Sequence, residues 1–106
     1  MSQQSIVVLG CGLVGSAIVT DLAIREGHPV LAVDISPTNL NRLPDHANIR
    51  TRQADVSEEG LIAELSRDAK LFICAVPGFM GFETLKKIIG TGVNVVDISF
   101  FPRSEE

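Results

Sequence analysis

The chain has 106 residues and a mass of 11.4 kDa, which is room for one domain around a single core. Hydrophobic residues make up 45% of it, so the composition excludes a disordered chain. The formal net charge is −4 and the basic residues are scattered, which argues against a nucleic-acid partner. No apolar run approaches the ~20 residues that cross a bilayer, and the first residues lack the pattern of a secretion signal. We expect a cytoplasmic protein with no membrane partner.

Strands and helices are predicted to alternate along the chain. Short apolar runs rich in β-branched residues predict five strands, at residues 5–9, 29–34, 48–52, 70–76 and 93–99. The third run is weaker, because arginines flank Thr51, and suits a sheet edge. Apolar residues at helical spacing, with capping residues, predict four helices: residues 13–26 ending at Gly27, one capped by Ser36, one capped by Ser57, and residues 82–89.

This alternation, with short connections, predicts an α/β domain of the Rossmann type, in which a doubly wound parallel sheet carries helices on both faces. The strand order 3-2-1-4-5 follows if the chain reverses direction after the third strand. The reversal leaves a crevice at the carboxyl ends of the first and fourth strands, where ligands of such sheets bind. We therefore expect binding residues in the loops that begin at Gly10, Asp34, Ala54, Ala75 and Ser99.

A glycine-rich turn follows the first predicted strand. Gly10, Gly12 and Gly15 have the G-x-G-x-x-G spacing, which serves a tight turn, close approach of the backbone to a pyrophosphate, and packing of a helix on a strand. The helix that begins near Leu13 and Val14 would point its free N–H groups at the phosphates. Turn geometry alone would explain the same spacing, but the position between a strand and a helix favours a dinucleotide site.

An acidic residue ends the second predicted strand. Asp34 lies 19 residues after Gly15, where a carboxylate accepts hydrogen bonds from the ribose hydroxyls of NAD. A 2′-phosphate would meet it as a like charge, and no arginine adjoins Ile35 and Ser36 unless Arg42 folds back. We expect these residues to bind NAD in preference to NADP. The alternative is that Asp34 only caps the helix that follows.

Four segments carry motifs beyond these single residues. They read VLGCGLVG at residues 8–15, ADVS at 54–57, AVPGFMG at 75–81 and VVDISF at 95–100. Many families share the first motif, whereas the third and fourth are more specific. Together the four segments resemble the N-terminal cofactor domain of the saccharopine dehydrogenase and lysine 6-dehydrogenase family, and the resemblance extends over nearly the whole chain.

The resemblance implies an oxidoreductase that oxidises an amino acid at a C–N bond by hydride transfer to a nicotinamide. It implies that two residues line the adenine side of the site, Asp55 and Val56. It also implies that further residues follow the cofactor toward its nicotinamide end, namely Ala75, Val76, Pro77 and Ser99. No general base or substrate-binding cation stands out in the sequence, so we expect no catalytic residue and binding without turnover.

Family members continue into a second domain that binds substrate, whereas this chain ends at Glu106. We therefore expect residues 1–106 to form a single dinucleotide-binding domain, either a fragment of a longer chain or a natural single-domain relative. Apolar residues gather near the ligand end of the sheet, at Phe79, Met80, Phe82, Phe100 and Phe101. We expect them to face the missing substrate domain or a second copy, or else to pack locally under the last helix. The open edge of residues 93–99 likewise predicts self-association.

Another class of protein fits the same features. The glycine turn and the acidic end of the second strand also resemble the nucleotide-sensing regulatory modules of potassium-uptake systems, which bind NAD or ATP. The motifs at residues 75–81 and 95–100 favour the dehydrogenases. A short-chain dehydrogenase or epimerase is disfavoured, because the chain contains no tyrosine for a Tyr-x-x-x-Lys pair.

The two cysteines match no zinc or thioredoxin spacing, so we expect no metal and no disulfide. Cys11 precedes a helix N-terminus, which favours a reactive thiolate, but a small residue that fits between two glycines is the simpler interpretation. Cys74 is expected in the core.

Overall fold

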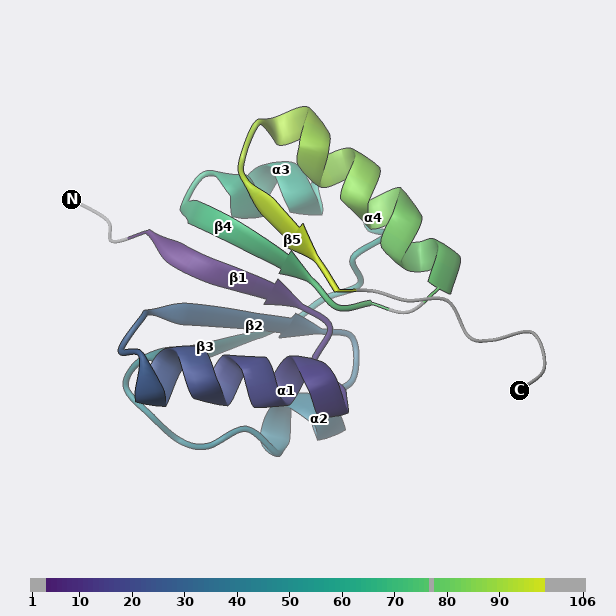
Figure 1. Ribbon diagram of the computed structural model, residues 1–106. Helices are drawn as coiled ribbons and strands as arrows, with labels where there is room; N and C mark the ends of the chain where they lie inside the picture. The colour runs from purple at the N-terminus through teal and green to yellow at the C-terminus, as the bar shows by residue number, and fades with distance from the viewer. Residues whose placement is uncertain (1–3, 77, 99–106) are drawn as a thin grey trace.

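The chain folds into one sheet with helices on both faces (Figure 1). The computed structural model describes residues 4–76 and 78–98, with the backbone alone for residues 78–80. The strands are β1 (Ser5–Leu9), β2 (Val30–Asp34), β3 (Ile49–Gln53), β4 (Ala69–Cys74) and β5 (Val95–Asp97). The helices are α1 (Leu13–Thr20), which continues as a π-helical turn η1 (Asp21–Arg25), α2 (Pro37–Asn41), α3 (Leu61–Ser66) and α4 (Gly78–Thr91).

The strand order is β3-β2-β1-β4-β5, and every neighbouring pair is parallel. This confirms the predicted Rossmann arrangement. The chain reverses direction after β3, so β1 and β4 become neighbours at the centre, with Leu9 opposite Cys74. The pairing continues one residue past the strands, where the N–H of Ala75 donates to the carbonyl oxygen of Leu9 at 2.8 Å. The crevice expected from this reversal therefore begins beyond Leu9 and Ala75.

Hydrophobic cores lie on both faces of the sheet. Along β1, Val7 and Leu9 belong to the core beneath α3 and α4, while Ile6 and Val8 belong to the core beneath α1. All four side chains are at most 4% exposed. Helices on both faces leave no side of the central strands for water, which explains why β1 is a continuous apolar run. No helix within residues 4–76 and 78–98 has the length and hydrophobicity needed to span a membrane.

Some predicted element boundaries are wrong. Ser57 does not cap a helix, because both its N–H and its hydroxyl donate to the carboxylate of Asp55, and α3 begins only at Leu61, after Gly60. This side-chain turn competes with helix formation. Similarly, α4 begins at Gly78 instead of residue 82, and β5 is shorter than predicted. The first helix does end at Gly27, whose φ is 76°.

Two glycines are required where β1, α1 and β4 meet. Gly10 has a φ of 95°, and a Cβ added to it would lie 2.8 Å from the carbonyl oxygen of Ala75. A Cβ on Gly15 would lie 1.8 Å from the carbonyl oxygen of Gly10. Both obstacles are backbone atoms that cannot rotate away, so the first turn of α1 lies against the end of β1 only because both residues lack a side chain.

We expect the substitution Gly15→Ala to lower the free energy of unfolding by about 1–3 kcal/mol, because the backbone of α1 must shift to admit the methyl group. Gly90→Ala is the matched control, since Gly90 is also helical but its Cβ would meet nothing within 4 Å. That control should be neutral or stabilise by up to ~1 kcal/mol. Chemical denaturation measures both variants, and equal midpoints for Gly15→Ala and the wild type would contradict the packing argument.

Candidate dinucleotide site

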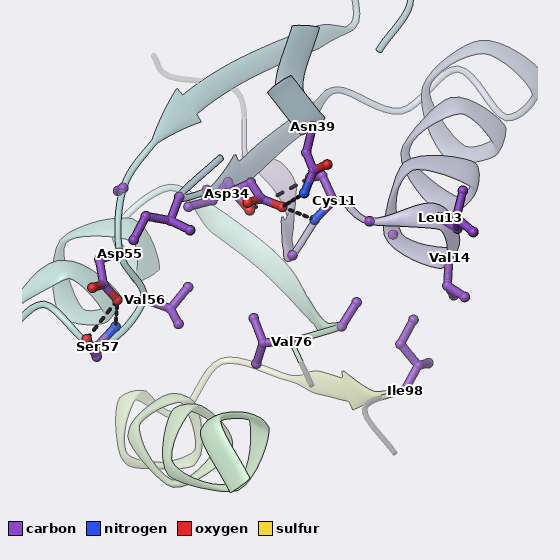
Figure 2. Close-up of a pocket in the computed structure, with 17 residues that line it drawn as sticks. Cys11, Leu13, Val14, Asp34, Asn39, Asp55, Val56, Ser57, Val76 and Ile98 are labelled. Carbon is purple, nitrogen blue, oxygen red and sulfur yellow. Dashed lines mark hydrogen bonds between the residues drawn. The ribbon is translucent and has the colours of Figure 1, made fainter. Parts of the chain in front are cut away.

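A cavity of about 720 Å³ opens at the carboxyl ends of the central strands (Figure 2). This volume lies within the range of small-molecule sites. The lining comes from the loops after β1, β2, β3 and β4 and from the segment after β5: Gly10, Cys11, Gly12, Leu13, Val14, Gly15, Val33, Asp34, Ile35, Asn39, Ala54, Asp55, Val56, Ser57, Ala75, Val76 and Ile98. Four loops distant in sequence thus meet at one place, as the predicted topology requires.

Most residues that the sequence predicted for the site line this cavity. They are Gly10, Gly12, Leu13, Val14, Gly15, Asp34, Ile35, Asp55, Val56, Ala75 and Val76. Ser36 does not line it; its hydroxyl accepts a hydrogen bond from the N–H of Asn39 at 3.2 Å and caps α2. Pro77 and Ser99 lie outside the described residues.

Gly12 differs from the other two glycines of the turn. Its φ is −70°, which any residue adopts, and a Cβ added to it would meet nothing within 4 Å. Neither backbone conformation nor packing within the described chain therefore requires glycine at this position. A side chain here would occupy the space in front of the turn, so the cradle fits a ligand whose phosphates approach the backbone closely.

The first turn of α1 is the second part of the cradle. Gly12 precedes the helix, and no side chain caps its free N–H groups. Uncapped N–H groups and the helix dipole together attract an anion. Leu13 and Val14, which begin the helix, are 84% and 49% exposed. The arrangement offers the pyrophosphate of a dinucleotide a set of backbone donors with no competing side chain.

Asp34, at the end of β2, lies directly beside this turn. One carboxylate oxygen accepts from the N–H of Cys11 at 2.6 Å and from the side-chain amide of Asn39 at 3.2 Å, as Figure 2 shows. The other oxygen accepts from the N–H of Ser36 at 2.8 Å. The carboxylate is thus fixed between the glycine turn and α2, where it can also accept from ribose hydroxyls.

A second carboxylate lies on the opposite side of the cavity. Asp55 accepts from the hydroxyl of Ser57 at 2.7 Å and from its N–H at 2.9 Å, and these bonds hold the pKa of Asp55 below its usual value. The same cavity has apolar side chains in its lining, among them Ile35, Val56 and Val76. An apolar slot with an acceptor at its end suits a heteroaromatic base with an exocyclic amino group.

The environment of Cys11 does not favour a reactive thiolate. Cys11 is fully buried, and burial, followed by the nearby charge of Asp34, raises the pKa of its thiol to about 12. Its sulfur instead lies 3.7 Å from the carbonyl oxygen of Val33. This supports the structural interpretation of Cys11, and Cys74 is buried in the core as predicted.

The sequence analysis missed several lining residues. The most informative is Asn39, which reaches the cavity from the first turn of α2 because Ser36 and Pro37 start that helix directly after β2. The sequence signal that could have indicated Asn39 is a polar residue five positions after Asp34, which ends β2. Ile98 was missed because it follows the short β5; its N–H donates to the carbonyl oxygen of Cys74 at 2.9 Å. In the described part of the chain, no cluster of His, Cys, Asp and Glu could hold a metal ion.

Comparisons with solved structures find the same fold in several proteins. The TrkA-N domain of the inner membrane protein YbaL from Escherichia coli has a TM-score of 0.75 and 17% identity, over 98% of this chain. Saccharopine dehydrogenase (L-Glu forming) from Saccharomyces cerevisiae has a TM-score of 0.75 and 19% identity over 93%. A putative epimerase from Bacteroides thetaiotaomicron has a TM-score of 0.72 and 25% identity over 91%. The matches cover 77%, 22% and 47% of those three chains, respectively.

The fold and the glycine-turn cavity define a domain that binds a nicotinamide dinucleotide. The family model described as "Saccharopine dehydrogenase NADP binding domain" matches residues 6–106. The chain belongs to this family, as the four sequence motifs indicated. A comparison with curated proteins found no match.

We expect Cys11 to resist alkylation in the folded chain. A pKa of about 12 in place of the ordinary 9.0 leaves roughly a thousandth of the thiolate at pH 8, and burial blocks the reagent further. Because the folded pKa is raised, the neutral thiol favours folding below pH 9, and this contribution is lost as the pH rises toward 12. Iodoacetamide labelling followed by mass spectrometry measures the rate, with the chain in guanidinium as control. Equal rates in the two conditions would contradict the assignment.

Proposed function

We propose that residues 1–106 are the cofactor domain of an amino-acid oxidoreductase similar to saccharopine or lysine dehydrogenases, and that the cofactor is NAD. The observation that carries the proposal is the pairing of the glycine turn with Asp34. Gly12 leaves open space in front of uncapped helix N–H groups, and the Asp34 carboxylate is bonded to the same turn. A pyrophosphate on the turn would place its adenosine ribose at Asp34.

Each part of the cavity receives one part of the cofactor in this proposal. Asp34 and Ile35 hold the ribose and the adjoining edge of the adenine, and Asp55 and Val56 hold its far side. The nicotinamide half runs past β4 toward the end of β5, along Ala75, Val76, Pro77, Ile98 and Ser99. Ser36 supports this arrangement from outside the cavity by capping α2.

The preference for NAD rests on charge. The family name specifies NADP, but a 2′-phosphate on the ribose would lie against the Asp34 carboxylate. Two like charges at about 4 Å repel by ~1 kcal/mol in water and more in a partly buried site. The cavity lining among the described residues contains no Lys, Arg or His to offset this repulsion. The acidic lining therefore favours a free 2′-hydroxyl.

Catalysis in this proposal needs residues beyond the described cavity. When bound, the nicotinamide would supply the hydride acceptor for the substrate carbon next to nitrogen. Among the described lining residues, the titratable groups are Cys11, Asp34 and Asp55. The first has a pKa of about 12, and the two carboxylates hold hydrogen bonds on the adenosine side. We therefore propose that this domain binds and orients the cofactor, while another part of the enzyme binds substrate and moves its proton. A cytoplasmic location belongs to the same proposal.

We expect calorimetric titration to show NAD binding at least tenfold tighter than NADP binding. Gly12→Val should abolish binding of both and lower the melting temperature only slightly, because its side chain fills the open space in front of the turn, although valine is a weaker N-cap than glycine. Gly90→Ala, remote from the cavity, is the control and should bind as the wild type does. ATP binding without NAD binding would contradict the dehydrogenase assignment and favour a nucleotide-sensing module.

The two sheet edges of the described chain differ. The edge strand β3 carries Arg50 and Arg52, which discourage pairing with another strand. The other edge, β5, has Val96 at 47% exposure, beside α4 with Phe82 at 54% and Ile89 at 62%. Because the chain spans 22% of the yeast saccharopine dehydrogenase, we propose that this apolar edge packs against the substrate domain of a longer enzyme chain.

We expect the 106-residue chain to bind a hydrophobic dye, and Ile89→Lys to weaken that binding, because the exposed side chain at this edge becomes charged. Ile24→Lys is the matched control, since Ile24 is 43% exposed but lies on η1. Dye fluorescence no stronger than that of an ordinary compact domain would contradict an exposed apolar face. Light scattering on the same samples distinguishes the two partners, because a dimer lost in Ile89→Lys would indicate a second copy instead.

A further inference from the structure

A second depression, of about 840 Å³, lies on the face of the sheet that carries α3. On the other face, α1 and α2 cover β2 and β3, whereas on this face α3 lies toward β4 and α4 (Figure 1). The six-residue α3 thus leaves this side of β2 and β3 open to a ligand. Among the described residues, no lining residue of the depression also lines the dinucleotide cavity.

Positive charge is concentrated in this depression. Three of the nine Lys and Arg residues of the chain line it, namely Arg50, Arg52 and Arg67. Only two of the thirteen Asp and Glu residues do so, Glu64 and Asp68. The chain as a whole has a formal net charge of −4. The depression is therefore a place of local positive charge on a negative protein, which attracts anions.

The side chain of Arg50 lies across the sheet instead of pointing away from its edge. Arg50 is level with Leu31 of β2, and its guanidinium donates to the hydroxyl oxygen of Ser5 on β1 at 2.9 Å. The side chain therefore passes over β2 into the depression. Protection of the sheet edge does not explain this path, because a charge protects an edge from any solvated position beside it.

The charge of Arg50 remains available to a ligand. Ser5 is 2% exposed, and its neutral hydroxyl fixes the guanidinium without cancelling the charge. Arg52 is paired with Glu64 at 2.8 Å, but neither Arg50 nor Arg67 forms an ion pair with a carboxylate of the described chain. A guanidinium has five N–H donors, so Arg50 can still hold a carboxylate through two parallel hydrogen bonds.

Apolar side chains line the same depression. Val7 and Leu65 belong to the core beneath α3, and the half-buried Leu31 packs against that core. The volume lies within the range of small-molecule sites, which combine apolar walls with a few polar groups. A doubly charged anion would be repelled by Glu64 and Asp68, so the lining favours a single negative charge on an apolar body.

We propose that this depression is a second ligand site, which binds a small organic acid with one carboxylate and an apolar body. Arg50 and Arg67 hold the carboxylate, Ser5 positions Arg50, and the apolar body lies on Leu31. The site lies apart from the dinucleotide cavity and does not depend on the proposed function.

The test is a titration of the isotope-labelled 106-residue chain with sodium hexanoate at neutral pH, followed residue by residue in NMR spectra. The amide signals of Leu31, Thr51 and Leu65, which line the depression, should shift along one saturable curve. Two further probes separate the parts of the ligand, since 1-hexanol lacks the charge and inorganic phosphate lacks the apolar body. Each should bind there about tenfold more weakly than hexanoate.

Three variants test the residues. Arg50→Gln should weaken hexanoate binding about tenfold, as expected for the loss of a charge-assisted hydrogen bond. Arg25→Gln is the matched control and should bind as the wild type does, because Arg25 is an exposed arginine on η1 that is paired with Asp21. Glu64→Gln should tighten binding several-fold, because it removes a carboxylate from the depression and frees Arg52.

Several results would overturn the proposal. Hexanoate that causes no saturable shift at Leu31, Thr51 and Leu65 does so, and so does hexanol or phosphate that binds there as tightly as hexanoate. Equal weakening by Arg50→Gln and Arg25→Gln would indicate attraction to net charge alone. Should Arg50→Gln fail to fold by circular dichroism, Arg67→Gln replaces it, since Arg67 is exposed. NAD takes no part in these titrations, so their outcome is separate from that of the proposed function.

Discussion

The passage of the chain from β1 into α1 depends on one close contact between backbone atoms. Gly15 approaches the carbonyl oxygen of Gly10 so closely that a Cβ would lie 1.8 Å from it, and Gly10 itself stands against the carbonyl oxygen of Ala75. These contacts bring the first turn of α1 to the ends of β1 and β4. The helix N-terminus, the floor of the cavity and the crevice between the two central strands all follow from this convergence.

The glycine turn divides its residues between the fold and the ligand. Gly10 and Gly15 are explained by contacts within the protein, whereas Gly12 meets nothing and has an ordinary φ. Cys11, between them, is fully buried and donates its N–H to Asp34. The motif therefore combines two requirements. Gly10 and Gly15 are required by the fold, whereas Gly12 is explained only by a ligand in front of the turn.

The sequence predicted the fold well because the fold depends on local patterns. Apolar runs, helical spacing and the glycine turn each specify an element, and short connections then leave few possible strand orders. Predictions failed where side chains compete for the same backbone groups. Serine is a residue type that often caps helices, but the N–H and the hydroxyl of Ser57 both donate to Asp55.

The glycines and carboxylates of the candidate site could be predicted from the sequence. The residues packed around them, such as Asn39, could not. Asp34 follows from its position at a strand end, because every parallel strand delivers its carboxyl end to the same edge of the sheet. Asn39 does not, because its approach to the cavity depends on the angle at which a five-residue helix leaves β2. Contacts of this kind are set by tertiary packing, and spacing in the sequence does not encode them.

In the proposed function, the Asp34 carboxylate must exchange a bond for a ribose to bind. A carboxylate has about four acceptor positions, and Cys11, Ser36 and Asn39 together fill three of them. Two ribose hydroxyls therefore need one position more than remains. The two backbone donors are held at 2.6 and 2.8 Å by the glycine turn and the start of α2, whereas the bond from the Asn39 amide is the longest of the three, at 3.2 Å. In this proposal Asn39 is the donor that yields, and its N–H then donates to a ribose oxygen. In the free chain, Asn39 thus donates to the Asp34 carboxylate, and in the proposed complex the same side chain contacts the ribose.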